Sequence, residues 1–331
     1  MRAICAPAVA LAALTLAAQG CLAKPAPAGP PLLVLERTIP LPGVNGRIDH
    51  LAIDPQRKRL FVAELGNSSV EAIDLATGHS LGRIAGLKEP QGVAYLPARN
   101  EVAVASGGDG TVRFYRADDL APAGSLVVGG DADNLRADPA TGALIVGFGD
   151  GALGVIEPAT RTVTRKAPLP GHPESFQIEA GHAFVNVPDA GAVVTVDLVS
   201  GRQLARWGNT AGRFNFPMAL APKGLAVVYR FPARLALIDR ATGRVLQAAD
   251  TCGDSDDVSV DAARRRLYVI CGGGAVDVFA EAGDGYRRLA RVPTRSGART
   301  GLYAPGLERL FVAARARGGD EAAILVLRPG P

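Results

Sequence analysis

The sequence predicts an all-β protein that folds as a seven-bladed β-propeller, and three observations carry this prediction. A short segment recurs seven times at a spacing of about 40 residues, which is the length of one four-stranded propeller blade. Glycine and proline are frequent, with 40 and 24 residues, and this indicates many turns. No window after residue 31 has a sustained helical period, which argues against a helical fold.

Each repeat begins with a residue that holds the same position within the repeat, which we call its phase. These positions mark the starts of the blades. The intervals between them stay close to about 40 residues, although the loops vary in length. The seven positions are Asp49, Gln91, Asp133, Glu174, Pro217, Asp256 and Arg299.

The first repeat shows how one unit becomes four strands. Three apolar runs are separated by the turns Asp54-Pro55 and Gly66-Asn67. A tight turn with Gly78 then leads to a fourth strand over residues 80–85, because glycine adopts the positive φ that such turns need. Continuous runs of Val, Ile and Leu fit strands that are buried between blades.

The seventh repeat is one strand short, and the amino-terminal segment can supply what is missing. The repeat contains strand patterns at residues 302–304, 310–314 and 323–327, after which the chain ends. Residues 33–39 match the outer strand of other repeats. We therefore expect this segment to pair with residues 323–327 and close the ring, which removes a weak seam.

The amino terminus has the pattern of an export signal. Arg2 precedes an apolar run over residues 8–18 that is too short to span a bilayer, and small residues follow it. We assign residues 1–23 to a signal peptide, 24–31 to a Pro/Ala-rich tether and 32–328 to the propeller. A lipoprotein signal that ends at Gly20, with lipidation of Cys21, is the alternative. The expected location is the periplasm or the extracellular space, with or without a lipid anchor.

The charge pattern narrows the classes of partner. The formal net charge is +4 and the basic runs are short, so we do not expect binding to nucleic acid. We expect a monomer that contacts a membrane only through a lipid anchor, if it carries one. Its partner would be an unidentified protein or small molecule.

Two cysteines remain beyond the export signal, Cys252 and Cys271. An even pair in an exported protein predicts a disulfide. A thiolate metal site and two free thiols are the alternatives.

Propeller geometry places the starts of the first strands and the turns between second and third strands on one face, which we call the funnel face. Candidate ligand-binding residues on it are Asp49, His50, Gln91, Asp133, Asn134, His172, Glu174, Asp256, Asp257 and Arg299. Four of them combine carboxylates with an imidazole, so they could hold a divalent cation: Asp133, His172, Glu174 and Asp256. The alternative is that these side chains only support turns and blades. No cofactor is otherwise indicated.

The opposite face is expected to be basic, which would give the molecule an acidic and a basic side. Its basic residues are Arg57, Lys58, Arg59, Arg99, Lys223, Arg264, Arg265, Arg266 and Arg309.

The repeats resemble those of the YncE-like family of secreted bacterial β-propellers with YVTN-type repeats. The resemblance runs from residue 33 to residue 327. Its most specific parts are Gly46-Arg47-Ile48-Asp49-His50-Leu51-Ala52-Ile53-Asp54, Leu87-Lys88-Glu89-Pro90-Gln91-Gly92-Val93, Pro170-Gly171-His172-Pro173-Glu174-Ser175-Phe176, Asn186-Val187-Pro188-Asp189-Ala190-Gly191 and Gly297-Ala298-Arg299-Thr300. It implies seven blades and export, and it implies little about chemistry.

The sequence favours a non-catalytic scaffold that binds a ligand or a protein through an acidic funnel face, and it leaves enzymatic activity undecided. One alternative is a metal-dependent hydrolase or lyase with its site at the funnel mouth. Another is a periplasmic redox accessory that resembles the heavy-chain propeller of quinoprotein amine dehydrogenase. The chain lacks the Gly-x-Ser-x-Gly motif of a serine hydrolase.

Overall fold

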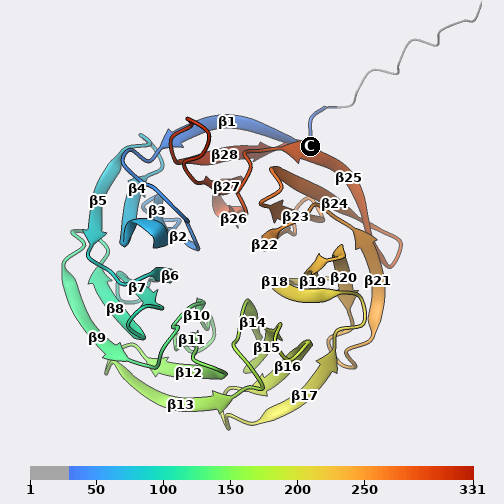
Figure 1. The fold of residues 1–331 in the computed structure, drawn as a ribbon, viewed down its shortest axis with the longest axis horizontal. Coiled ribbons are helices and arrows are strands. Elements are labelled where there is room, and N and C mark those ends of the chain that lie inside the picture. Colours follow the sequence, from blue (N-terminus) through green and yellow to red (C-terminus); the bar gives the residue numbers. More distant parts are fainter. Residues whose placement is uncertain (1–29) are drawn as a thin grey trace, which may run out of the picture. The chain divides into compact units, whose positions relative to one another are not determined.

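The computed structural model describes residues 30–331, and Leu32–Pro331 form one compact unit. Within this unit, seven antiparallel four-stranded sheets stand around a common axis, as the repeats predict (Figure 1). Most of the assigned signal peptide and tether, with Cys21, lies outside the described residues. None of the helices in residues 30–331 has the length and apolar character needed to cross a membrane.

Each blade takes four strands, numbered along the chain. Blade 1 contains β2 (Leu51–Asp54), β3 (Arg59–Glu64), β4 (Ser69–Asp74) and β5 (Ser80–Ala85). Blade 2 contains β6 (Pro90–Leu96), β7 (Glu101–Ser106), β8 (Thr111–Arg116) and β9 (Pro122–Val127). Blade 3 contains β10 (Leu135–Ala137), β11 (Leu144–Phe148), β12 (Ala152–Glu157) and β13 (Thr162–Pro168). Blade 4 contains β14 (Phe176–Glu179), β15 (His182–Val187), β16 (Ala192–Asp197) and β17 (Gln203–Gly208).

The remaining blades follow the same order, except for the last. Blade 5 contains β18 (Arg213–Ala221), β19 (Gly224–Phe231), β20 (Ala233–Ile238) and β21 (Val245–Asp250). Blade 6 contains β22 (Ser255–Asp261), β23 (Arg266–Cys271), β24 (Ala275–Ala282) and β25 (Gly285–Pro293). Blade 7 contains β26 (Thr300–Ala304), β27 (Arg309–Ala314), β28 (Ala323–Pro329) and β1 (Leu33–Pro40). Short 3₁₀ turns cover Leu65–Asn67 and Pro305–Leu307.

The amino-terminal strand closes the ring, which confirms the expected pairing. β1 runs antiparallel to β28, from Leu33 opposite Pro329 to Pro40 opposite Ala323, with one bulge between Leu35 and Arg37. The two strands lie side by side in Figure 1. The last blade therefore joins the two ends of the chain through a ladder of backbone hydrogen bonds.

The hydrophobic core is divided into layers that lie between neighbouring blades. The layer between blades 7 and 1 contains Leu60, Phe311 and Val326, and each of the other six junctions has a comparable cluster among the described residues. The second strands are the most buried, since every residue of β3 and of β23 is buried. Each large apolar side chain that is buried there contributes about 1.5–3 kcal/mol to stability.

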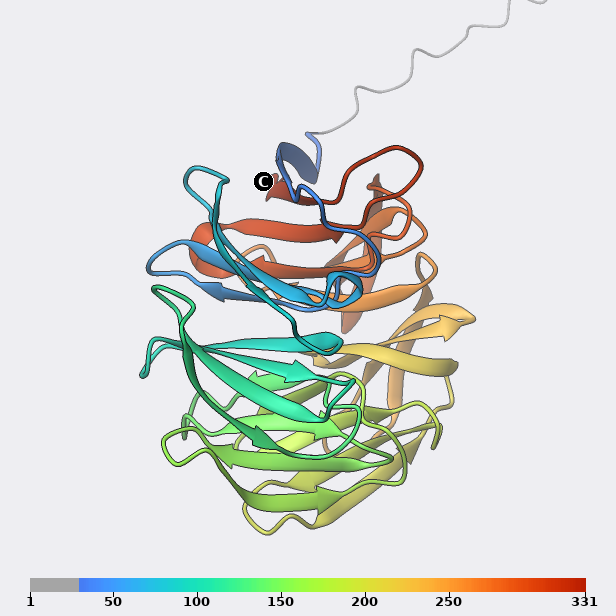
Figure 2. The ribbon, with the colours of Figure 1, turned by 60° about the vertical axis from the view of Figure 1, so that its left-hand side comes forward.

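The blades bring their first strands together near the axis. β2 contacts both β6 and β26, and β18 contacts both β14 and β22. The blades appear as separate twisted sheets when the ring is turned (Figure 2). Because every first strand begins at the same face, residues that are about 40 positions apart in sequence meet at the funnel mouth.

Candidate functional site at the funnel mouth

The same backbone pairing holds three of the phase-matched carboxyl residues at the starts of their blades. The N–H of Asp49 donates to the carbonyl of Ala63 (2.7 Å), which lies on the second strand of the same blade. Asp133 and Glu174 donate in the same way to Gly147 and Asn186, both at 2.9 Å. The repeat therefore fixes the backbone of each residue before any side-chain contact is made.

One small cavity collects the carboxyl groups that the repeat phase predicts would meet. The space in it that is open to a water-sized group is only about 10 Å³. Asp49, Asp133, Glu174 and Asp256 all line it, together with Arg47, His50, Asn134, Ser175 and Phe216. Four blades contribute a carboxyl group, so the site exists only in the closed ring.

Asp133 is paired with imidazoles and with no arginine. Its side chain is 9% exposed, and its Oδ1 atom has no hydrogen-bond partner in the described part of the chain. The nearest cationic groups are two imidazoles, His50 Nε2 at 3.9 Å from Oδ1 and His172 Nε2 at 4.0 Å from Oδ2. A buried acceptor without a donor costs roughly 1–3 kcal/mol, and more when it is charged.

Close backbone approach between blades 2 and 3 positions Asp133. A Cβ atom at Gly92 would lie 2.0 Å from the carbonyl oxygen of Asp133. Only glycine fits this contact without a backbone shift. The Gly92 position of the second repeat is therefore part of the construction of the site.

The two histidines flank Asp133 from different blades. His172 Nδ1 lies 2.8 Å from the carbonyl oxygen of Gly149 and 3.6 Å from Asp131 Oδ2. His50 Nδ1 lies 4.0 Å from Asp257 Oδ2. Both imidazoles are thus surrounded by oxygen atoms, which favours their protonated forms.

Arginines pair with two of the other carboxylates, Asp49 and Asp256. Arg47 donates to Asp49 at 3.1 Å. Asp256 pairs with Arg230 on one side and with Arg299 Nε, at 2.8 Å, on the other. The funnel face is therefore less acidic than the sequence predicts, because arginine side chains lie among its carboxylates.

The remaining predicted residues join the same cluster. Gln91 Nε2 donates to Asp131 Oδ1 at 3.0 Å, and Asp257 Oδ2 accepts from the N–H of Gly301 at 2.8 Å. Asn134 is 3% exposed and lines the cavity. All ten residues selected from the sequence thus lie in or beside the funnel mouth.

The sequence analysis missed four residues of this cluster: Arg47, Arg136, Phe216 and Arg230. The Arg230 guanidinium lies over the Phe216 ring, 3.7 Å from its centroid. Arg136 donates to the Phe176 carbonyl and lies 5.7 Å from that ring. Phe216 immediately precedes Pro217, which starts the fifth repeat. The alignment of the repeats could therefore have placed Phe216 at the funnel mouth.

Burial shifts the acid strength of several carboxyl groups in the cluster. Burial raises the pKa of Glu174 to about 8, and the neighbouring charges of Asp133 and Asp256 act in the same direction. Burial also raises the pKa values of Asp49 and Asp257 to about 6, against the opposing charge of His50. These groups therefore hold their protons more tightly than exposed carboxyl groups do.

The histidine shifts have the opposite origin. Burial acts to lower the pKa of His172, but Asp133, the Gly149 carbonyl and Asp131 outweigh it and raise the pKa to about 9. The pKa of His50 is also raised, because Asp49, Asp257 and Asp133 outweigh burial. His172 therefore carries positive charge near neutral pH.

A disulfide supports the loop that carries the blade 6 carboxylates. Cys252 and Cys271 are bonded, with 5.8 Å between their Cα atoms, and both are buried. The bond joins the segment before β22 to the end of β23. A Cβ atom at Gly272 would lie 2.1 Å from Asp254 Oδ2, so this loop packs tightly against the strand end.

The arrangement does not suit a metal ion as it stands. Among residues 30–331, no group of three or more His, Cys, Asp or Glu side chains is placed so that it could hold an ion. Asp133, His172, Glu174 and Asp256 are neighbours, but they do not converge on one point. The divalent cation stays a prediction of the sequence.

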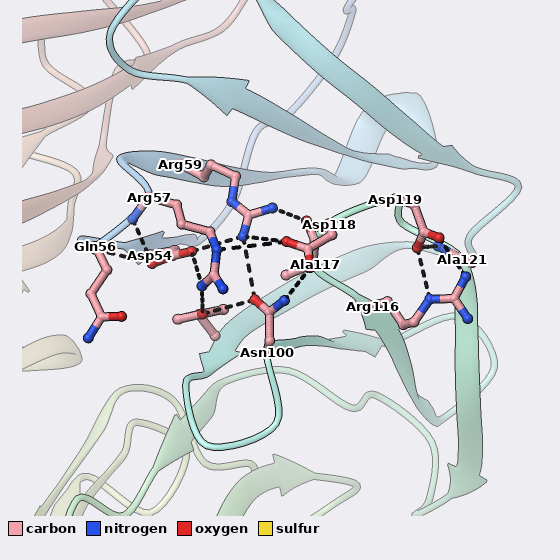
Figure 3. A network of polar contacts seen from close by, with 11 residues as sticks. Asp54, Gln56, Arg57, Arg59, Asn100, Arg116, Ala117, Asp118, Asp119 and Ala121 are labelled. Carbon is pink, nitrogen blue, oxygen red and sulfur yellow. Dashed lines mark hydrogen bonds and ion pairs between the residues drawn. The ribbon is translucent and has the colours of Figure 1, made fainter.

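The arginines expected to make the opposite face basic are largely paired with carboxylates, and Figure 3 shows this for Arg57 and Arg59. Arg59 donates to Asp54 at 3.0 Å and pairs with Asp118 at 3.1 Å, across blades 1 and 2. Other pairs on this face are Arg99–Glu101, Arg264–Glu308, Arg265–Glu281 and Arg309–Glu36. The expected separation of charge between the two faces is reduced because each face mixes both signs.

Comparison with known proteins places the chain among β-propellers of known structure. No family model matches the sequence, and no match was found among curated proteins. A chain of "Kuenenia stuttgartiensis Hydrazine Synthase" is similar with a TM-score of 0.74 and 16% identity, over 84% of this chain and 94% of that one. A chain of "Crystal Structure of Mitotic Checkpoint Complex" has a TM-score of 0.75 and 15% identity, over 96% and 99%.

A third structure, "Structure of U3-55K", has a TM-score of 0.75 and 12% identity, over 88% of this chain and 97% of that one. At these identities the likeness concerns the fold alone. The protein is a seven-bladed β-propeller in architecture.

Proposed function

We propose that the protein is an exported, non-catalytic scaffold that binds a ligand or a partner protein at the funnel mouth. The observation that carries the proposal is Asp133, a buried carboxylate with one oxygen atom that has no hydrogen-bond partner among the described residues, in a cavity to which four blades contribute a carboxyl group. Such a group costs stability, and proteins keep costs of this kind mainly at sites that bind or react.

Two further observations support binding and export. One structural neighbour belongs, by its name, to a complex, which supports a role in macromolecular binding. The repeat segments support membership of the YncE-like family, and the amino-terminal sequence pattern supports export. The paired arginines favour a binding surface of mixed charge over a purely acidic one.

The test compares binding by wild type with binding by a funnel variant. The protein is immobilised and exposed to its native cell envelope extract and to a panel of cationic, anionic and neutral small molecules. We expect at least one specific partner to be lost from the double variant Asp133→Ala/Asp256→Ala. The matched control, Asp109→Ala/Asp189→Ala, changes two carboxylates on the same face outside the cavity and should keep the partner. Equal recovery by all three proteins would contradict the proposal.

A further inference from the structure

A second cavity opens on the opposite face, between blades 7 and 1, which are neighbours in Figure 1. The space in it that is open to a water-sized group is about 470 Å³. Sites for small molecules usually measure about 300–1,000 Å³. We call it the seam cavity, because it lies where the blade that joins the two terminal strands meets blade 1. It shares no lining residue with the funnel mouth.

The base of the seam cavity is apolar. Leu75, Phe311 and Val326 line it, and all three belong to the buried core layer between blades 7 and 1. Leu307, from the 3₁₀ turn before β27, also lines the cavity and is only partly buried. A guest with an apolar part would cover these side chains, and the removal of apolar surface from water would favour its binding.

The polar lining of the seam cavity carries more positive than negative charge. Its cationic side chains are Arg37, Lys58 and Arg309, and its one carboxylate is that of Glu36. Arg309 pairs with this carboxylate, with Nη2 at 2.8 Å from Glu36 Oε1. Within residues 30–331, neither Arg37 nor Lys58 forms an ion pair with a carboxylate. Two cationic side chains therefore remain unmatched at the cavity.

Arg37 is held in place at the rim of the seam cavity. Its Nη1 atom donates to the Ala76 carbonyl at 3.3 Å, and its Nη2 atom donates to the Leu75 carbonyl. These contacts join β1 to the turn that follows β4. A guanidinium has five N–H donors, so three remain for a guest, and its planar fork suits the oxygens of a carboxylate or a phosphate.

We propose that the seam cavity binds a small organic anion, whose acidic head group accepts hydrogen bonds from Arg37 and Lys58 and whose short apolar chain lies on the cavity base. The head group matches the excess of positive charge, and the chain matches the apolar residues beneath it. A carboxylic acid and a phosphate monoester share this chemistry. The inference goes beyond the proposed function, because the site lies on the other face. Since the guest would contact both β1 and blade 1, its binding should also stabilise the closed ring.

The experiment measures the binding of matched probes by titration calorimetry at constant ionic strength. The probes are hexanoate, hexyl phosphate, hexanol, hexylamine and acetate. We expect saturable binding of the first two and none of hexanol or hexylamine. Acetate has the head group without the chain and should bind about tenfold more weakly than hexanoate, or weaker still. Tighter binding of hexanoate would identify a carboxylic acid as the natural class of guest, and tighter binding of hexyl phosphate a phosphate ester.

Two variants test the charge and the space of the seam cavity, and a third is the matched control. Lys58→Gln removes a positive charge from the rim and should weaken hexanoate binding about fivefold. Ala76→Phe places a large ring at the rim and should abolish binding by filling the space. Lys223→Gln removes a positive charge from the same face outside the cavity and should leave the affinity unchanged. Circular dichroism and thermal unfolding confirm that each variant is folded.

Hydrogen exchange locates the bound anion. Saturating hexanoate should slow the exchange of backbone amides in β1 and in the turns of blade 1 more than in blades 3 to 5. Protection of blades 3 to 5 that equals or exceeds the protection of β1 would overturn the assignment to the seam cavity.

The remaining outcomes separate this inference from the proposed function. Hexanol or hexylamine that binds as tightly as hexanoate would overturn the anion site. Equal losses in Lys58→Gln and Lys223→Gln, or no binding of either anion, would also overturn it. The funnel variant Asp133→Ala/Asp256→Ala should bind hexanoate as wild type does, so the failure of one site leaves the other standing.

Discussion

The funnel mouth and the opposite face both bury carboxylates, but they treat them in different ways. On the opposite face, burial acts to raise the pKa of Asp54, yet hydrogen bonds from the Arg57 backbone and the Arg59 side chain lower it below its usual value (Figure 3). At the funnel mouth, burial prevails and raises the pKa of Glu174 to about 8. The first arrangement keeps the carboxylate charged and paired, and the second leaves the carboxyl group protonated at neutral pH.

Breaking the network of the opposite face should have the largest effect. Arg59→Met leaves the buried Asp54 with a weaker set of partners, and we expect the free energy of unfolding to fall by about 3 kcal/mol. Urea denaturation measures the loss. The control is Arg234→Met, whose exposed pair with Asp250 should contribute less than about 1 kcal/mol. Equal losses in the two variants would remove the distinction between a structural network and surface pairs.

Removing the disulfide tests how much the covalent bond, beside the ion pairs of the funnel mouth, stabilises the segment before β22. Cys252→Ala/Cys271→Ala should lower the free energy of unfolding by about 3 kcal/mol, because it frees a loop of 19 residues in the unfolded chain. Thermal unfolding measures the change. A reducing agent should destabilise wild type and leave the variant unaffected. A variant as stable as wild type would show that packing alone holds the segment with Asp254 and Asp256.

The same substitution should have opposite signs on the two faces. Asp54→Asn removes a well-paired charge and should lower the free energy of unfolding by about 2 kcal/mol. Asp133→Asn removes a buried charge that is served by imidazoles and by no arginine, and it should raise the free energy of unfolding by about 1 kcal/mol. Guanidinium denaturation of both variants at pH 7 gives the comparison. If Asp133→Asn proves as damaging as Asp54→Asn, the Asp133 carboxylate is structural.

A further comparison concerns pH, and the two faces should oppose each other. A raised carboxyl pKa means that the folded protein binds more protons than the unfolded chain between the two values. For Glu174 this window runs from 4.5 to about 8, and for His172 from 6.5 to about 9, so stability falls as the pH rises through these windows. Asp54 has a lowered pKa, so its contribution is present above 3.8 and is lost as the pH falls.

Denaturation of wild type and Glu174→Gln between pH 3 and 10 measures this difference. The variant should lose part of the decline between pH 4.5 and 8, and keep the acid limb that belongs to the opposite face. A variant with the same profile as wild type would show that Glu174 does not hold its proton in the folded state.

The fold could be predicted because two features are visible in the sequence itself: the repeat of about 40 residues, and the absence of a fourth strand pattern in the last repeat. The interval from Asp49 to Gln91 to Asp133 gave the blade length. The missing outer strand of the last repeat pointed to β1, and the pairing of Leu33 with Pro329 follows from it. Local turn chemistry and a constant phase are enough to specify such an architecture.

The site could be predicted only in part. The position of a residue within the repeat indicates whether it lies near the axis, but it does not indicate which side chains it contacts. Asp133 and Glu174 meet as their shared phase requires. Arg230 comes from the end of β19, and its contact with Asp256 depends on how blades 5 and 6 pack. The pairing of Arg59 with Asp118 also crosses two blades, so spacing within one repeat cannot show it.

Because β1 pairs with β28, the ring can close only when both strands are present. β28 lies between β1 and β27 in the last blade. A polypeptide that stops before β28 therefore leaves β1 and β27 without the strand that both pair with. Such a fragment presents open strand edges, which bind other chains and attract proteases. A chain that lacks β28 therefore cannot close the ring and is more exposed to aggregation and proteolysis than a chain that contains it.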